Sequence, residues 1–272
     1  MNLENIKLVI TDMDGTLLNS KHEVSGKFLN QFKQLQYHNI MFVAASGRPY
    51  YSIVEKLNSI KNDIIIVAEN GGIIVDNTKV LASKSIANSK IKSIDNIIDT
   101  IEDIITIYCT KDLAYIKDTS PENITIVKEY YSNYRLIKSI SEIKDNVVKI
   151  ALYHSKSSES FIYPFVKRFN DNNKVIISSP NWVDISEKGI NKGNALNIIL
   201  ENYNIKDTEV LAFGDYNNDI EMLKKTNFSV AMANAHKDVK TISNFETTSN
   251  DDFGVERILD LLLEQKINFQ KQ

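Results

Sequence analysis

The chain has 272 residues, 43% of them hydrophobic, and carries a formal net charge of −3. This length supports one large or two medium domains, and the acidic balance argues against nucleic acid or an anionic membrane surface as a partner. A single cysteine, Cys109, excludes an intrachain disulfide; with an N-terminus unlike a signal peptide, it favours a cytoplasmic protein. No apolar stretch approaches the roughly 18 residues that a membrane span requires.

The first seventy residues alternate short apolar runs with segments of helical periodicity. Apolar runs at 7–11, 41–45 and 64–68 predict buried strands, and the spacing of apolar residues over 25–37 and 50–57 predicts two helices. Strands that are continuously apolar are typical of a parallel sheet covered by helices on both faces. The order of elements is therefore that of an α/β fold.

The pattern changes after residue 70. Residues 71–82 predict a hairpin with Asp76-Asn77 in its turn. Predicted helices and strands then alternate, which indicates an α+β unit with an antiparallel sheet. The helices are expected at 89–106, 122–131 and 158–169, and the strands at 105–109, 114–116, 147–153, 175–179 and 182–185.

After Gly189 the first pattern returns, with helices predicted at 192–203, 220–225 and 255–266 and strands at 210–213 and 228–231. We therefore predict an α/β fold class. Its Rossmann-like parallel-sheet core is formed by residues 1–82 and 188–272, and an α+β domain is inserted between them at 83–187.

Two aspartates, Asp12 and Asp14, follow the first predicted strand. Residues two apart in an extended chain point the same way, and Gly15 allows the sharp turn that follows. One carboxylate can attack phosphorus while the second protonates the leaving oxygen. Taken alone, the pattern is more typical of a turn followed by a helix cap.

Two further polar residues lie at predicted helix starts. Ser46 precedes Gly47-Arg48, where a hydroxyl and free backbone N–H groups bind phosphate oxygens well, although an ordinary N-cap has the same pattern. Lys192 begins a helix, where an ammonium opposes the helix dipole and needs an anionic partner such as phosphate or Asp12. A solvated surface lysine stays equally open.

The last acidic pair is Asp215, which follows the strand at 210–213, and Asp219, at the next helix start. Magnesium prefers oxygen ligands, usually one or two protein carboxylates with substrate and water, and Asp215 with Asp12 meets that requirement. Asp219 is also typical of an acid that stabilises the first turn of a helix. Because open parallel sheets bind ligands at their strand ends, these groups predict a site for magnesium and a phosphate.

In this order and spacing, the clusters resemble the four motifs of the haloacid dehalogenase superfamily of phosphohydrolases. The match is closest to its Cof-type branch (class IIB), in which a large C2-type cap is inserted after the third strand. The resemblance to the motifs DxDGT, SGR, NKG and GDxxND is carried by residues 12–16, 46–48, 191–193 and 214–219. Residues 69–72 and 232–235 also resemble stretches typical of the branch, whereas the cap matches only in length and rhythm.

The resemblance implies a role for each matching residue. Asp12 is expected to be the nucleophile and a metal ligand, and Asp14 the general acid and base, with its backbone carbonyl also on the Mg²⁺. Lys192 is expected to neutralise charge between nucleophile and phosphate, Asp215 to complete the metal site, and Asp219 to support it. Residues expected to bind phosphate or substrate are Thr16, Ser46, Gly47, Arg48 and Asn218.

The expected activity is hydrolysis of a small phosphorylated metabolite, such as a sugar phosphate, nucleotide or phosphorylated cofactor, by a monomer or weak homodimer. A phosphomutase would share the same intermediate and stays open. A signalling phospho-acceptor domain also uses aspartate, magnesium and lysine, but it has no need of Asp14 and leaves the inserted domain unexplained. Dehalogenation is disfavoured because it has no use for Asp14 or for metal-binding acids.

Overall fold

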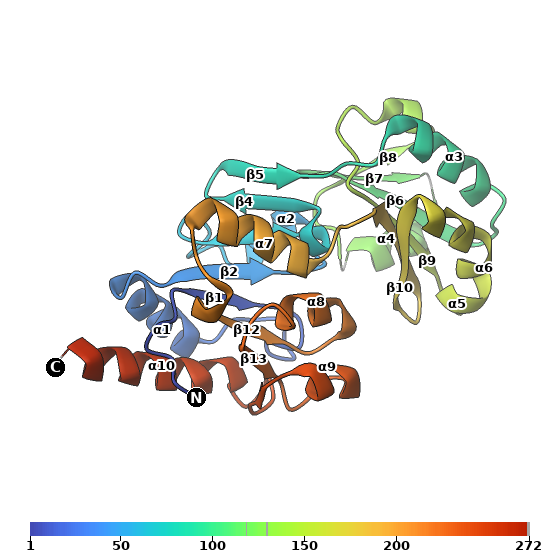
Figure 1. Cartoon of the computed structure of the whole chain (residues 1–272). Helices are drawn as coiled ribbons and strands as arrows, with labels where there is room; N and C mark the ends of the chain where they lie inside the picture. The colour runs from blue at the N-terminus through green and yellow to red at the C-terminus, as the bar shows by residue number, and fades with distance from the viewer. Residues whose placement is uncertain (118, 129, 271–272) are drawn as a thin grey trace. The chain divides into compact units, whose positions relative to one another are not determined.

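The structure is a computed structural model that describes residues 1–117, 119–128 and 130–270 (Figure 1). The chain forms two compact units. Unit 1 contains Met1–Gly47, Ile53–Leu81 and Asn191–Gln272, and unit 2 contains Arg48–Ser52 and Ala82–Ile190. No helix within the described ranges is both long and apolar enough to cross a membrane.

Unit 1 is built on an eight-stranded sheet with the strand order β14-β13-β12-β1-β2-β3-β4-β5. The six strands from β14 to β3 run parallel to one another, whereas β4 pairs antiparallel with β3. The bounds in sheet order are Phe245–Glu246, Phe228–Ala231, Val210–Gly214, Leu8–Thr11, Met41–Ala45, Ile65–Ala68, Ile73–Asp76 and Lys79–Ser83.

Helices pack against this sheet (Figure 1). They are α1 (Gly26–Tyr37), α2 (Tyr50–Lys56), α7 (Lys192–Tyr203), α8 (Ile220–Leu223), α9 (Lys237–Ile242) and α10 (Gly254–Gln270), with short 3₁₀ turns η1 (Glu69–Gly71), η4 (Asp207–Glu209) and η5 (Asn217–Asp219). All four residues of β1 are buried. Helix α1 begins after Ser25, whose Oγ accepts the Phe28 N–H at 2.9 Å, and it packs Phe28 against Phe42 of β2 with ring centroids 5.1 Å apart. The predicted α/β fold class is confirmed by this sheet.

Unit 2 is an α+β unit with a six-stranded sheet in the order β10-β11-β9-β6-β7-β8. In sheet order the strands are Asn173–Ser179, Trp182–Glu187, Lys149–His154, Ile104–Cys109, Ala114–Lys117 and Tyr134–Ile137. Its helical segments are α3 (Asn88–Ile98), α4 (Pro121–Lys128), η2 (Ile140–Glu142), α5 (Ser158–Phe161), α6 (Tyr163–Val166) and η3 (Lys167–Asp171). The apolar face of α3 packs against the sheet through Ile91, Ile94 and Ile98, in a core that includes Tyr108 and Ile150.

Three sequence predictions for unit 2 are wrong in detail. The helix expected over 89–106 ends at Ile98, because Asp103 turns the chain with a φ of 54° and the β-branched run after it pairs with β9. The helix expected over 158–169 is broken into three short pieces around Pro164. The sheet is also not wholly antiparallel, since β8, which was not predicted, runs parallel to β7.

Candidate functional site

The predicted site residues of unit 1 gather at the ends of its parallel strands. Asp12 directly follows β1, Ser46 follows β2, Asp215 follows β12, and the η1 turn follows β3. Because these strands are parallel neighbours, their carboxyl ends lie along one edge of the sheet. Segments that are far apart in the sequence therefore meet at this edge.

Three carboxylates form the centre of the site. Asp12, Asp215 and Asp219 each place an oxygen within 4.8 Å of the others, which is close enough for the three to surround a metal ion. The N–H of Asp12 donates to the Phe213 carbonyl at 3.1 Å, and the Thr16 hydroxyl donates to Asp215 Oδ1 at 2.9 Å. These two bonds fix Asp12 against β12 and Asp215 against the loop after β1.

Gly15 explains why this loop can approach Asp215 so closely. Its φ is 77°, a left-handed conformation, and a Cβ at this position would lie 2.4 Å from Asp215 Oδ2. Glycine is thus required both for the turn and for the space that the carboxylate occupies.

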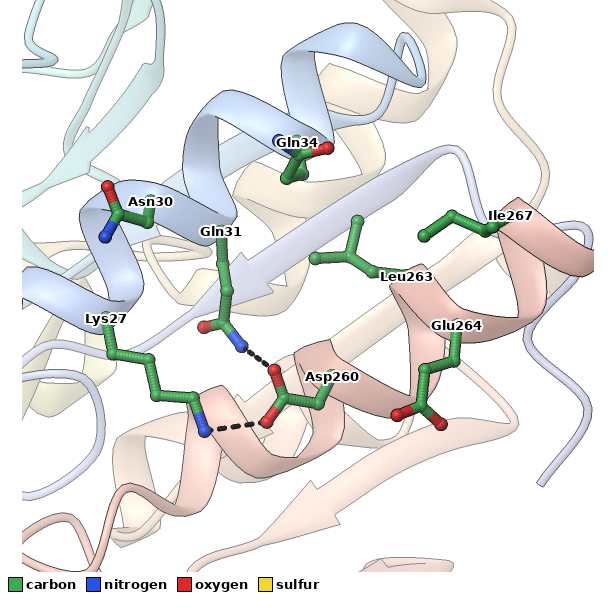
Figure 2. A pocket seen from close by; sticks show the side chains of 8 residues that line it. All are labelled: Lys27, Asn30, Gln31, Gln34, Asp260, Leu263, Glu264 and Ile267. Carbon is green, nitrogen blue, oxygen red and sulfur yellow. Dashed lines mark hydrogen bonds and ion pairs between the residues drawn. The ribbon is translucent and has the colours of Figure 1, made fainter.

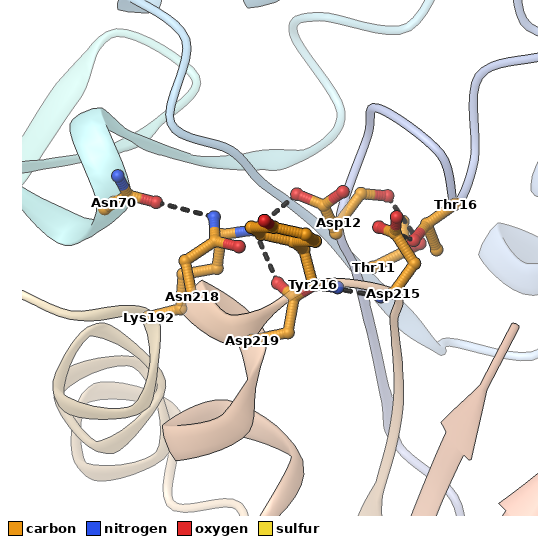
Figure 3. A network of polar contacts seen from close by, with 9 residues as sticks. All are labelled: Thr11, Asp12, Thr16, Asn70, Lys192, Asp215, Tyr216, Asn218 and Asp219. Carbon is orange, nitrogen blue, oxygen red and sulfur yellow. Dashed lines mark hydrogen bonds and ion pairs between the residues drawn. The ribbon is translucent and has the colours of Figure 1, made fainter. Parts of the chain in front are cut away.

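Lys192 is buried in the centre of the cluster and has no exposed surface. It begins α7, whose N-cap Asn191 accepts the Asn194 N–H at 2.7 Å. The Lys192 ammonium donates to Asp12 Oδ1 and, at 2.6 Å, to Asp219 Oδ1 (Figure 3). A solvated surface lysine is therefore the wrong interpretation, and the anionic partner that its position requires is supplied by two aspartates.

Burial and like charges shift the protonation of this cluster. Burial raises the pKa of Asp12 well above its usual value, with Asp219 and Asp215 acting in the same direction against Lys192. Burial, together with Asp219, also raises the pKa of Asp215 to about 6. Burial lowers the pKa of Lys192, but its two carboxylate partners outweigh this and keep it charged. The three acids carry more negative charge than one ammonium neutralises, which is the environment that a divalent cation would stabilise.

Asp219 supports the loop that carries Asp215. Its Oδ2 accepts the N–H groups of Asp215 and Tyr216 at 3.0 and 3.1 Å, and its side chain is fully buried. A Cβ on Gly214 would lie 2.6 Å from the Cβ of Asp219, so the preceding glycine is needed for this close approach. The position agrees with an acid that supports the site rather than one that faces solvent.

Asp14 lies outside the carboxylate cluster. Its side chain is 38% exposed, and its Oδ1 is 3.2 Å from Nδ1 of His22 in the loop that follows. The metal contact predicted for Asp14 is made by its backbone carbonyl and does not require the side chain to lie in the cluster. The role of the side chain as general acid and base stays a prediction.

The residues of unit 1 that are expected to bind phosphate lie at the same edge of the sheet as the cluster. Ser46 is buried, and its carbonyl accepts the N–H of Asn70 at 2.9 Å, while Asn218 donates through Nδ2 to Asn70 Oδ1 at 2.9 Å (Figure 3). Gly47 is adjacent to Ser46 and lies against the Asn70 side chain. Arg48 belongs to unit 2, where its Nη1 donates to Ser52 Oγ at 3.4 Å, and its contact with substrate stays a prediction.

Three asparagines contribute to this edge although sequence reasoning gave them no role. Asn70 connects Ser46 and Asn218, Asn234 donates to the Gly15 carbonyl at 2.8 Å, and Asn250 donates to the Leu18 carbonyl at 2.9 Å. The first two lie in stretches, 69–72 and 232–235, whose resemblance to the Cof-type branch was the only signal of their importance. Asn250 begins the stretch 250–255, which departs from the pattern of the branch at Phe253, and no role was predicted for it.

A cavity of about 490 Å³ lies elsewhere in unit 1, between α1 and α10 (Figure 2). Asp260 organises one side of it, accepting from Lys27 Nζ and Gln31 Nε2, both at 2.6 Å. The cavity is lined by Lys27, Asn30, Gln31, Gln34, Asp260, Leu263, Glu264 and Ile267. None of the predicted site residues lines it, so it is separate from the carboxylate cluster.

The family model for haloacid dehalogenase-like hydrolases matches residues 9–259. The chain belongs to this family. The family predicted from the four motifs is thus confirmed, and the chain is an enzyme, a hydrolase of the haloacid dehalogenase type.

Two similar proteins align with this haloacid dehalogenase-like hydrolase over almost its whole length. A protein of Escherichia coli K12 named 5-amino-6-(5-phospho-D-ribitylamino)uracil phosphatase YbjI is 29% identical over 270 residues, which cover 98% of this chain and 100% of that protein. The crystal structure of SMU.1108c from Streptococcus mutans UA159 is 32% identical with a TM-score of 0.86, covering 95% of this chain and 99% of that one.

A second similar structure is that of BT4131, described as a sugar phosphatase of haloacid dehalogenase subclass IIB. It has a TM-score of 0.79 at 20% identity and covers 93% of this chain and 98% of its own. At this identity the likeness concerns the fold alone.

Proposed function

We propose that this chain is a magnesium-dependent phosphatase that hydrolyses a small phosphorylated metabolite through an aspartyl-phosphate on Asp12. The observation that carries the proposal is the placement of Asp12. It lies at a strand end, is held by a buried ammonium, and is grouped with two further carboxylates. A nucleophilic carboxylate of this kind splits phosphate-ester hydrolysis into two displacements on phosphorus.

In the first step, an oxygen of Asp12 forms a bond to phosphorus and the bond from phosphorus to the leaving oxygen breaks. Asp14 supplies the proton that the leaving oxygen needs. In the second step, Asp14 removes a proton from water, the water oxygen attacks phosphorus, and the bond to Asp12 breaks. Inorganic phosphate is released and both carboxyl groups return to their starting states.

Lys192 and the acidic cluster account for the charge that these steps develop. The Lys192 ammonium touches Asp12, so it can neutralise negative charge shared between the nucleophile and the phosphoryl group. The residues present fit magnesium, since Asp12 and Asp215 offer hard oxygen ligands in a cluster with excess negative charge. Asp14 would add its backbone carbonyl. When bound, the ion would supply charge neutralisation and orientation of the phosphoryl oxygens.

The substrate is expected to be recognised in two parts. Ser46, Gly47 and Asn218 of unit 1 would hold the phosphoryl group, assisted by Thr16 through its bond to Asp215. Residues 83–187 would act as a cap that selects the remainder of the substrate and excludes water. Because the E. coli relative is named for a phosphorylated ribitylaminouracil, such a compound belongs with sugar phosphates, nucleotides and phosphorylated cofactors among the candidates.

The test is phosphate release from a panel of these compounds by the purified protein, with magnesium and with EDTA. Magnesium-dependent release that disappears in Asp12→Asn is the expected result, and the ranking of substrates identifies the physiological class. A fully active Asp12→Asn variant would contradict the proposal. Interconversion of glucose 1-phosphate and glucose 6-phosphate without release of phosphate would identify a phosphomutase instead.

A further inference from the structure

The turn that follows β3 has an unusual backbone. Glu69, Asn70 and Gly71 have φ angles of 52°, 56° and 102°, so three consecutive residues adopt the left-handed region. This region is unfavourable for residues other than glycine, with asparagine the least disfavoured of them. A turn of this kind persists only where its surroundings hold it, and such turns are concentrated at functional sites.

The turn is held first by the loop after β2. The N–H of Asn70 donates to the Ser46 carbonyl at 2.9 Å, and the N–H of Ser46 donates to the Val67 carbonyl at 2.8 Å. The side chain of Asn70 lies directly against Gly47, where a Cβ would be 3.2 Å from Nδ2 and 3.4 Å from Oδ1 of Asn70. The Ser46-Gly47 loop and the turn thus determine each other's position.

The same turn also contacts two further motif segments, those at 214–219 and 191–193. Oδ1 of Asn70 accepts a hydrogen bond from Asn218 Nδ2 at 2.9 Å (Figure 3). Gly71 lies against the start of α7, where a Cβ would be 2.7 Å from the carbonyl oxygen of Asn191, the residue before Lys192. Groups from three segments of the chain, each predicted to contact the phosphate, therefore meet at this one turn.

We propose that Asn70 is a positioning residue that fixes Asn218 relative to the Ser46-Gly47 loop and so shapes the phosphate-binding part of the site. This inference rests on the proposed function. Phosphate is held best when its ligands are already placed before binding, and the Asn70 side chain is the group that contacts both segments. Asparagine suits the position because its oxygen accepts from Asn218 while its backbone tolerates the left-handed conformation.

The chain offers variants that separate the side chain from the backbone. Asn70→Gly removes the amide but keeps the left-handed backbone and its N–H bond to Ser46. Asn77→Gly is a matched control, because Asn77 has a φ of 54° in the exposed turn between β4 and β5. Both variants make the same chemical change in the same backbone conformation, but only the first lies at the site.

The experiment measures binding of inorganic phosphate by calorimetry, in the presence of magnesium, to the full-length protein and its variants. Asn70→Gly is expected to weaken phosphate binding about fivefold to tenfold, as for the loss of one hydrogen bond, whereas Asn77→Gly leaves it unchanged. In the Asn218→Ala background the same Asn70→Gly change is expected to weaken binding less than about twofold, because the residue that it positions is already gone.

Two results would overturn the inference. One is phosphate binding by Asn70→Gly equal to that of the wild type; the other is a double variant whose losses multiply, which would show that Asn70 does not act through Asn218. A wild-type protein that neither binds phosphate nor hydrolyses any compound of the panel would instead overturn the proposed function, and the inference with it.

Discussion

Lys192 donates a hydrogen bond to Asp219 across 2.6 Å, and neither side chain has any surface exposed to solvent. The other oxygen of Asp219 accepts the N–H groups of Asp215 and Tyr216. One buried carboxylate therefore connects the ammonium that contacts Asp12 to the loop that carries Asp215. Removing one member of such a pair leaves uncompensated charge and unpaired N–H groups in the interior.

Replacing Asp219 by alanine is expected to lower the free energy of unfolding by about 3 kcal/mol. The measurement is urea unfolding followed by circular dichroism. Asp63→Ala is the control, since it removes an exposed carboxylate and is expected to change stability by less than about 0.5 kcal/mol. Equal unfolding midpoints for the two variants would show that loss of the Asp219 carboxylate leaves no costly unpaired charge or N–H group in the interior.

Replacing Asp12 by asparagine is expected to abolish turnover without unfolding the protein. Burial raises the pKa of Asp12, so its charged form is unfavourable in the fold; the amide introduced by Asp12→Asn would keep an oxygen for Lys192, while Asp219 continues to neutralise the ammonium. Phosphate release should fall by about a thousandfold or more, while the midpoint of urea unfolding stays equal to or above that of the wild type.

The change in the unfolding midpoint of Asp12→Asn shows whether a loss of activity comes from the missing nucleophile or from a damaged fold. A large loss of both activity and stability would indicate that Asp12 is needed for the fold, and the loss of activity would then say nothing about a nucleophile. Retention of more than about a tenth of the activity would contradict the assignment of Asp12 as the attacking group.

The sequence was sufficient to predict the parallel sheet of unit 1 because its strands are short, continuously apolar and each followed by a polar motif. Asp12, Ser46 and Asp215 could be placed at one edge for this reason alone. Lys192 could not be distinguished from a surface lysine, because its burial depends on packing between α7 and segments about 180 residues away in the chain. Asn70 was missed for the same reason, since its partner Asn218 is distant in sequence.

In unit 2, local pattern was a weaker guide. Apolar residues at helical spacing continued from α3 into β6, so the pattern did not mark where the helix ends, and the left-handed Asp103 that separates them carries no strong signal. The short β8, Tyr134–Ile137, exposes two of its four residues and was not recognised as a strand. Its pairing with β7 depends on tertiary contacts, which cannot be predicted from a local sequence pattern.

Replacing Gly15 by alanine is expected to weaken magnesium binding while leaving most of the fold intact. The added Cβ would lie 2.4 Å from Asp215 Oδ2 in a left-handed backbone, so the carboxylate must move. We expect the half-saturating magnesium concentration for phosphate release to rise about tenfold, as for the loss of roughly 1.4 kcal/mol of binding free energy.

Gly26→Ala is the matched control for this change. Gly26 begins α1, and a Cβ there would meet no atom within 4 Å. Alanine also favours the helix over glycine, so this variant should keep the magnesium dependence of the wild type and be no less stable. A magnesium requirement in Gly15→Ala equal to that of Gly26→Ala would show that Asp215 does not contact the ion.

The magnesium requirement is expected to increase at acidic pH because protons compete with the metal for Asp215. Burial raises the pKa of this carboxyl to about 6 in the absence of metal, so most of it is protonated at about pH 5.5 and little of it at about pH 7.5. The ionised fraction falls about fourfold over this interval, and the half-saturating magnesium concentration should rise by about the same factor. A requirement that is independent of pH over this interval would contradict a metal-binding role for Asp215.

The stability of EDTA-treated protein provides a second readout of the same group, with a defined sign. A carboxyl whose pKa is raised on folding binds protons more readily in the native state than in the unfolded chain, so its contribution to stability is present below about pH 4 and is lost as the pH rises through about 6. In Asp215→Asn this decrease should be absent, and magnesium added to the wild type should oppose it by binding the ionised form. Urea unfolding of both proteins at a series of pH values, with EDTA and with magnesium, measures the difference. If the wild type and Asp215→Asn show the same dependence on pH in EDTA, the pKa of Asp215 is not raised by folding.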